Sequence, residues 1–179
     1  MALVADSGSA AQSWPGGPGF KKPMNKKIGN IDCVPILYEF LPHMADAKFR
    51  AYGHSLEEVL ANAATALVSL MWAADRVRPI RKESIKVEAS SLEQLTVKFL
   101  TEFLYLLDVK SFLLAKVESI QVEEAQKDGR KVYRLAAQVA GDDVSPQYEI
   151  YGLVKAVTYN EIKIEKNDGG WVLEAVVDM

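Results

Sequence analysis

The fold class is decided by residues 114–139, which read LAKVESIQVEEAQKDGRKVYRLAAQV. Apolar and polar residues alternate on both sides of a central Lys127-Asp-Gly-Arg130 segment. Alternation with a period of two is typical of a strand that is buried on one face, and a two-residue Asp-Gly connection is a strong hairpin signal. This stretch therefore predicts an antiparallel hairpin with strands over 114–126 and 132–139.

Two amphipathic helices are predicted upstream of the hairpin. Ser55-Leu-Glu-Glu58 and Ser91-Leu-Glu-Gln94 both have the spacing of a capping box, in which the serine oxygen accepts an N–H and the later side chain reaches back. Apolar residues then recur at helical spacing, which indicates a core-facing stripe on each helix. They are Leu56, Val59, Leu60, Ala63, Ala64, Leu67 and Met71 in the first helix, and Leu92, Leu95, Phe99, Leu100, Phe103 and Leu107 in the second.

Further strands are expected at 48–52 and 84–89, where polar and apolar residues alternate, and at 171–177, after the turn Asn167-Asp-Gly-Gly170. Residues 148–166 read as extended chain, either as two strands or as one strand bent by a bulge near Gly152. Since strands outnumber helices and occur in local hairpins, we predict an α+β fold, with two helices packed on one face of a mainly antiparallel sheet in a two-layer sandwich. The basic segment 76–82 has no interleaved aromatic residue, which favours a solvated connector over a nucleic-acid site.

Composition bounds the domain organisation and the compartment. With 179 residues, 49% of them hydrophobic, the chain can bury one core, and its net charge of -3 provides no global attraction to nucleic acid. Residues 1–34 are rich in Gly, Ser, Ala and Pro, so we predict a disordered tail before a domain over 35–179. The single cysteine, Cys33, excludes an intramolecular disulfide and indicates a reducing compartment, the cytoplasm or nucleus. N-terminal targeting stays open, and no membrane span is expected.

Motifs of common enzymes are absent from the sequence. It has no Gly-rich phosphate loop, no Gly-x-Ser-x-Gly elbow and no His-Glu-x-x-His helix. A Cys33–His43 nucleophile pair would need a spatial arrangement that sequence cannot supply. His43 and Asp46 follow a strand-like run that ends at Pro42. Catalysis by a recognised motif is therefore not predicted.

Oxygen donors gather at the end of the chain. Asp178 closes an apolar strand, and the α-carboxylate of Met179 follows at once. Calcium and magnesium prefer such carboxylate oxygens, above all when two or three come from separate segments. From spacing alone, a solvated terminus is the alternative to a cation site.

Five ordered blocks then carry a resemblance that covers about residues 36–179. The blocks are Tyr38-Glu-Phe-Leu-Pro-His-Met-Ala-Asp46, Ala51-Tyr-Gly-His-Ser-Leu-Glu-Glu58, Phe99-Leu-Thr-Glu-Phe-Leu-Tyr105, Val154-Lys-Ala-Val-Thr-Tyr159 and Val176-Val-Asp-Met179. In this order and at these intervals the chain resembles the archease family. Archeases activate the RtcB-type RNA ligase of tRNA splicing and are not themselves the ligase. The resemblance thus implies a non-catalytic activator whose partner is such a ligase, with RNA contacted only indirectly.

The resemblance also implies roles for individual residues. A divalent metal ion, calcium or magnesium, is expected at Asp46 and Asp178, with the carboxylate of Met179 joining them. The candidates for ligase activation are Lys155, His43, Glu39 and Glu102. For His43 an orienting role is expected rather than metal ligation. Lys155 could instead extend its ammonium to solvent at a sheet edge, and Glu102 could belong to the polar face of its helix.

Three departures from the family pattern lie next to these residues. Pro42, Met44 and Ala47 stand where the family has aspartate, threonine and valine. A carboxylate and a hydroxyl are missing as a result, so metal binding is expected to be weakened or reshaped. Two other readings of the chain remain, a stand-alone metal-dependent phosphohydrolase and a metal-free, chaperone-like binding module.

Overall fold

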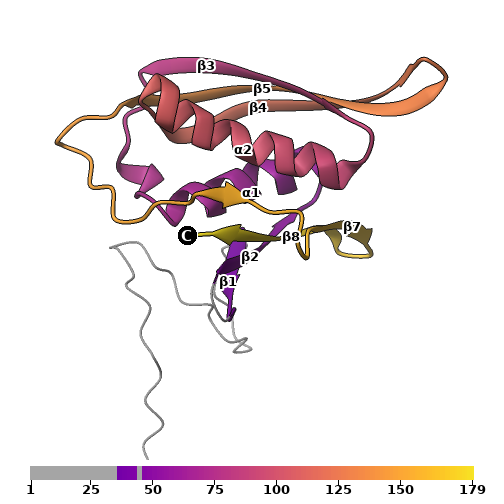
Figure 1. Ribbon diagram of the computed structural model, residues 1–179, viewed down its shortest axis with the longest axis horizontal. Coiled ribbons are helices and arrows are strands. Elements are labelled where there is room, and N and C mark those ends of the chain that lie inside the picture. Colours follow the sequence, from indigo (N-terminus) through magenta and orange to yellow (C-terminus); the bar gives the residue numbers. More distant parts are fainter. Residues whose placement is uncertain (1–35, 44–45) are drawn as a thin grey trace, which may run out of the picture.

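The structure is a computed structural model that describes residues 36–43 and 46–179. Within these residues the chain forms eight strands, two α-helices and one short 3₁₀ helix, η1 (Ala74–Arg76) (Figure 1). The strands are β1 (Tyr38–Leu41), β2 (Ala47–Gly53), β3 (Arg81–Ala89), β4 (Phe112–Lys127), β5 (Arg130–Asp143), β6 (Ala156–Val157), β7 (Lys163–Asn167) and β8 (Gly170–Asp178). The helices are α1 (Leu56–Ser69) and α2 (Leu92–Lys110).

The strands divide between two antiparallel sheets. One is five-stranded with the order β1-β2-β8-β6, and β7 also pairs with β8. The other is three-stranded with the order β3-β5-β4. Both helices lie between the two sheets in Figure 1. The α+β class is confirmed, but the strands that we expected in one sheet form two, and the helices are covered from both sides.

Helix α1 shows why the second sheet is needed. It contacts β2 and β8 of the five-stranded sheet and β4 of the three-stranded sheet. None of its residues is exposed, whereas α2 exposes Lys98, Tyr105 and Val109. Small residues such as Ala63, Ala64 and Ala66 are completely buried, which lets the neighbouring layers approach closely. The apolar stripe read from the sequence captured only part of this buried surface.

Both predicted capping boxes are present. Ser55 Oγ accepts from the N–H of Glu58 at 3.1 Å, and a carboxylate oxygen of Glu58 accepts from the N–H of His54 at 2.7 Å. At α2, Ser91 Oγ accepts from the N–H of Gln94 at 3.2 Å. These side chains satisfy N–H groups that have no acceptor within the helix, so each helix begins where the sequence indicated.

The predicted hairpin is confirmed and is longer than expected. β4 and β5 pair from Phe112 opposite Asp143 to Lys127 opposite Arg130, with register irregularities near the start of β4. The two turn residues, Asp128 and Gly129, both have positive φ, as a type I′ turn requires. The strand expected at 84–89 also begins earlier, because Arg81 and Lys82 of the predicted connector belong to β3.

The connection from β5 to β6 is anchored before it reaches the C-terminal sheet. Tyr148 donates its hydroxyl hydrogen to the buried Asp142 carboxylate at 2.6 Å, which lowers the pKa of Asp142. The N–H of Tyr151 donates to the Met71 carbonyl at 2.9 Å. A Cβ on Gly152 would lie 2.2 Å from the Leu70 carbonyl oxygen, so glycine here permits close backbone approach. Of the two alternatives for residues 148–166, the structure has two strands, β6 and β7, and Gly152 lies outside the strands of the described chain.

Two expectations fall on the N-terminal region. The predicted tail over 1–34 and Cys33 lie outside the described residues. The domain boundary at residue 35 therefore stays a prediction.

Candidate functional site

The two aspartates singled out in the sequence lie at one end of the β2–β8 ladder. The last pair of this ladder is Ala47 opposite Val177. Asp46 directly precedes Ala47, and Asp178 directly follows Val177. Because the strands are antiparallel, these neighbours flank the same ladder end. The fold thus brings together two carboxylates that are far apart in the sequence.

Asp178 shares a face of β8 with Glu174, because side chains in a strand alternate with a period of two. The opposite face of β8 carries Leu173, Ala175 and Val177, which belong to the hydrophobic core. Asp178 is half-buried, as is Asp46. The candidate site therefore lies on the face of the five-stranded sheet that points away from the helices.

Lys155 joins the same ladder end from the opposite side of β8. Its N–H donates to the Asp178 carbonyl at 2.8 Å, and its Nζ donates to the main-chain oxygen of Met179 at 2.6 Å. Lys155 is exposed, so its ammonium group remains accessible to solvent. Three of the predicted residues, Lys155, Asp178 and Met179, are thus linked directly.

His43 lies between two carboxylates. Its Nδ1 is 3.9 Å from Oδ2 of Asp46, and its Nε2 is 3.6 Å from Oε1 of Glu161. These distances exceed those of hydrogen bonds, and Nδ1 is shielded from solvent with no hydrogen-bond partner among the described residues. The side chain is 23% exposed. His43 therefore lies close to Asp46 without a hydrogen bond to it, and its orienting role stays a prediction.

Glu39 is part of a network on the same outward face. It lies opposite Arg50 in the β1–β2 register, and its Oε1 accepts from Arg50 at 3.2 Å and from the Tyr52 hydroxyl. Burial and the hydrogen bond to Glu39 raise the pKa of Tyr52. One Glu39 oxygen is thus occupied by neighbouring strand residues, which is a structural use of this candidate.

The network continues toward the aspartates through alternating charges. Glu174 accepts from Arg50 at 2.8 and 2.6 Å and lies 3.2 Å from Lys48 Nζ. Lys48 in turn donates to Oε2 of Glu161 at 2.7 Å. Burial alone would raise the pKa of Glu174, but hydrogen bonds from Arg50 and Lys48 outweigh it and lower this pKa. The hydrogen bond from Lys48 also lowers the pKa of Glu161.

Sequence reasoning missed Lys48, Arg50, Glu161 and Glu174 as neighbours of the site. The alternation over 48–52 identifies Lys48 and Arg50 only as the polar face of a strand. One signal was available, because their alternation indicated a charged face opposite the core. The acidic partners come from β8 and from the turn after β6, and their register with β2 could not be read from spacing.

Glu102 differs from the other candidates. It is half-buried on α2, in the layer between the sheets. Within the described part of the chain, no hydrogen bond or ion pair links Glu102 to the two aspartates. The structure therefore does not join Glu102 to the site.

The donor chemistry at the ladder end fits a hard cation with few protein ligands. Asp46 and Asp178 supply carboxylate oxygens, and Met179 supplies main-chain oxygen, the ligand types that calcium and magnesium prefer. Across residues 36–43 and 46–179, no group of three or more His, Cys, Asp or Glu side chains is arranged to hold a metal ion. A bound cation would therefore depend on main-chain oxygen and water to complete its coordination.

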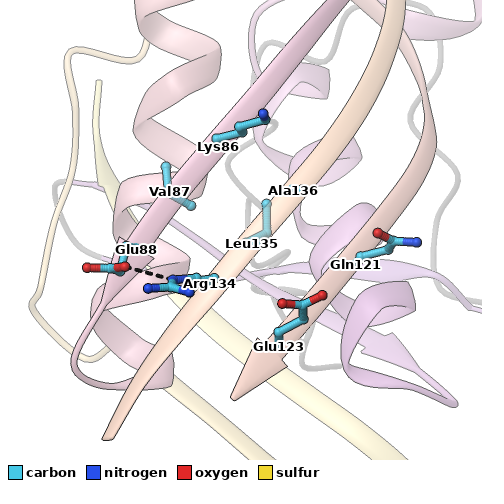
Figure 2. A pocket seen from close by; sticks show the side chains of 8 residues that line it. All are labelled: Lys86, Val87, Glu88, Gln121, Glu123, Arg134, Leu135 and Ala136. Carbon is cyan, nitrogen blue, oxygen red and sulfur yellow. Dashed lines mark hydrogen bonds and ion pairs between the residues drawn. The ribbon is translucent and has the colours of Figure 1, made fainter. Parts of the chain in front are cut away.

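A hollow of about 310 Å³ lies elsewhere, on the three-stranded sheet (Figure 2). Ala136 forms part of its floor, and Lys86, Gln121, Glu123 and Arg134 are among the side chains that surround it. Arg134 is paired with Glu88 at 2.9 Å. In this hollow a short side chain lies among long polar ones. Its lining residues include neither Asp46 nor Asp178, so within the described chain the hollow is separate from the carboxylates at the β2–β8 ladder end.

Helices long and apolar enough to span a membrane are absent from the part of the chain that the structure describes.

Comparison with known proteins places the chain in a family. The model of the Archease protein family (MTH1598/TM1083) matches residues 38–179. Protein archease of Methanosarcina mazei is 37% identical over 145 residues, which cover 79% of this chain and 95% of that protein. Protein archease of Pyrobaculum calidifontis is 36% identical over 147 residues, covering 81% of this chain and 97% of that protein.

A solved structure supports the same assignment. The solution structure of Methanobacterium thermoautotrophicum protein 1598 is similar to this chain with a TM-score of 0.66 and 28% sequence identity. The similarity covers 80% of this chain and 99% of that one. On the family match, the relatives and the shared fold, the chain belongs to the archease family.

Proposed function

We propose that this protein is a non-catalytic, cation-binding activator of an RtcB-type RNA ligase in tRNA splicing, which promotes guanylylation and turnover of the ligase. Membership of the archease family supports the proposal. The single cysteine favours a reducing compartment, the cytoplasm or the nucleus, for this activity. The ligase supplies the reacting groups, and this chain supplies positioned charges.

The observation that carries the proposal is the placement of Asp46 and Asp178 at one ladder end, beside Lys155 and Met179. These groups come from the residue before β2, from the end of β8 with the residue that follows it, and from the segment before β6. No enzyme motif accounts for their meeting at this end of the sheet. Calcium or magnesium bound there would neutralise negative charge on a nucleotide phosphate close to the ligase.

Each residue has a distinct task in this proposal. Asp46 and Asp178 bind the cation through their carboxylates, and main-chain oxygen of Met179 adds a ligand. Lys155 holds Met179 through its ammonium group and keeps that positive charge at the exposed rim. A positive charge at this rim also attracts phosphate. His43 stays beside Asp46 and limits its orientation.

The test is activation of purified ligase by Asp46→Asn and Asp178→Asn variants. Both variants retain side-chain size and remove one carboxylate charge. We expect the rate of ligase guanylylation to fall at least about tenfold in each variant. Mutation of residues that only support metal ligands typically lowers metal affinity or activity about 10- to 100-fold, and these aspartates are the proposed ligands themselves. The matched control is Asp108→Asn, which removes a carboxylate from the exposed surface of α2. Circular dichroism checks that all variants are folded.

Full activation by both folded aspartate variants would refute the site. The same preparation, assayed without ligase against nucleotides and phosphoesters, tests the phosphohydrolase reading. Turnover that disappears in Asp46→Asn would favour that reading. If calorimetry detects no binding of calcium or magnesium, and activation is still unaffected by the variants, the metal-free binding module is favoured.

A further inference from the structure

We propose that Glu161 is a positioning residue that holds His43, and through it the Asp46 segment, against the β2–β8 ladder end. The proposal rests on the proposed function for its consequence in cation binding, but its structural part can be tested alone. Neither the capping and strand patterns nor the five sequence blocks pointed to Glu161.

The two carboxylate oxygens of Glu161 serve two different neighbours. Oε2 accepts from Lys48 Nζ at 2.7 Å, and Oε1 lies 3.6 Å from His43 Nε2. On the other side of the imidazole, Nδ1 lies 3.9 Å from Asp46. The imidazole is therefore enclosed between Glu161 and Asp46, and the Glu161 end is fixed by a lysine.

Lys48 gives this arrangement a rigid base. It belongs to β2, two residues after Asp46, and its ammonium group also lies 3.2 Å from Glu174 on β8. Glu174 is held in turn by two hydrogen bonds from Arg50. Glu161 is thus connected to both strands of the ladder whose end carries Asp46 and Asp178.

The backbone around Glu161 is built to present this side chain. Before it, the N–H and hydroxyl of Thr158 both donate to the Val176 carbonyl, at 3.2 and 2.9 Å. After it, Lys163 pairs with Glu174 at the start of β7. Glu161 itself has φ of 53°, a left-handed conformation that is unfavourable for a residue with a Cβ. Such a conformation persists only when its surroundings impose it, and both flanking segments here are attached to β8.

These contacts define what Glu161 does. It does not itself reach the aspartate pair in the described structure, so it acts through His43. If Glu161 loses its charge, Lys48 and His43 lose a common anchor, and Asp46 loses its fixed neighbour. A cation that binds at Asp46 and Asp178 would then have to order the Asp46 segment. The entropy lost in this ordering would lower the affinity for the cation.

The first test observes His43 directly. The chain has two histidines, His43 and His54, so their imidazole ¹⁵N signals can be assigned with a His54→Gln variant. We expect Glu161→Gln to shift the ¹⁵N signals of His43 and the amide signal of Asp46. Glu165→Gln is the matched control, since Glu165 lies on β7, close to Glu161 in sequence, and within the described residues it forms an ion pair with Lys163 alone. Unchanged His43 signals in Glu161→Gln would overturn the proposal, whether or not the protein binds a cation.

The second test separates positioning from simple charge. Calorimetric titration with calcium chloride should show about tenfold weaker binding for Glu161→Gln, the lower end of the range for residues that support metal ligands. The decisive variant is Lys48→Met, which removes a positive charge but also frees Glu161. If Glu161 acts by positioning His43, Lys48→Met should weaken calcium binding, because Glu161 loses its anchor. If only the net charge near the site matters, Lys48→Met should strengthen calcium binding, because a positive charge that repels the cation is removed. Stronger binding would overturn the proposal.

The two tests also distinguish this proposal from the proposed function. If the unmodified protein binds no calcium and does not activate the ligase, the proposed function fails. Shifted His43 signals in Glu161→Gln would still support the positioning role in that case.

Discussion

The β4–β5 pairing of the three-stranded sheet and the β2–β8 pairing of the five-stranded sheet join segments with very different separations in the sequence. In the three-stranded sheet, β4 and β5 are consecutive and joined by a two-residue turn. In the five-stranded sheet, β2 pairs with β8, and the Arg50–Glu174 contact joins residues 124 positions apart. The candidate site lies in the second sheet. A site at such a junction forms only when distant segments of the chain have met, so it depends on the global fold more than the hairpin does.

The outward faces of the sheets differ as well. On the five-stranded sheet, Glu174 and Arg50 are partly buried and connected across strands. On the three-stranded sheet, the Glu88 pairs with Lys127 and Arg134 are much more exposed. Exposed pairs are screened by solvent and contribute little. The comparison indicates that ion pairs between neighbouring strands help to stabilise the face that carries the site.

The largest effect is expected from a substitution that disrupts the packing beneath the five-stranded sheet. Phe49 on β2 is completely buried, and Phe49→Ala should lower the free energy of unfolding by about 3–5 kcal/mol. Tyr133→Ala, at a half-buried position of the hairpin, should cost only about 1 kcal/mol. Urea denaturation measures both values. Equal losses would contradict the view that the site sheet depends more strongly on the common core.

An intermediate effect is expected at the hairpin turn. Gly129 has φ of 72° and open space around it, so the cost of Gly129→Ala is backbone strain alone. We expect a loss of about 1–2 kcal/mol. Amide hydrogen exchange should detect faster opening near 124–133 and little change at β2 and β8. Loss of protection at β2–β8 to the same extent would show that the two sheets are not independent in this respect.

The smallest effect concerns pH. Since the pKa of Glu174 is lowered in the folded chain, its charged form stabilises the fold above the ordinary glutamate value of 4.5. That contribution is lost as the pH falls through the lowered folded value. Glu174→Gln should cost less than about 1 kcal/mol at neutral pH and should flatten the decline of stability in acid.

Denaturation curves between pH 3 and 7 measure this difference, and the counterpart on the other sheet is Glu88→Gln. The pKa of Glu88 is also lowered, by hydrogen bonds from Lys127 and Arg134, but its side chain is more exposed than that of Glu174. We therefore expect a smaller change of slope for Glu88→Gln. If the slope of stability against pH changes more in Glu88→Gln than in Glu174→Gln, the idea that ion pairs stabilise the five-stranded sheet in particular is refuted.

Much of the local structure followed from short patterns. The serines at positions 55 and 91 predicted both helix starts, and Asp128-Gly129 predicted the hairpin. These features depend on residues within a few positions of one another, so sequence spacing contains the needed information. The division of strands between two sheets did not follow, because alternation shows that a strand has a buried face but not which partner lies beside it.

The candidate site divides in the same way. Asp46, Asp178 and Lys155 could be named from the sequence and its family resemblance, as could His43 beside Asp46. The positions of Lys48, Glu161 and Glu174 around them could not, since each contact joins different strands or turns. Glu102 shows the converse, a residue that the pattern suggested and that the described contacts leave outside the site.

By itself, the sequence determined which residues could begin helices, turn the chain and offer oxygen donors, because these properties belong to single residues and their near neighbours. Only the tertiary structure decided that β2 and β8 are paired so that Asp46 and Asp178 flank one ladder end. It also decided that a glutamate from the turn after β6 reaches His43. The physical reason is that strand register is selected by burial on both sides of the helical layer, a property of the whole chain.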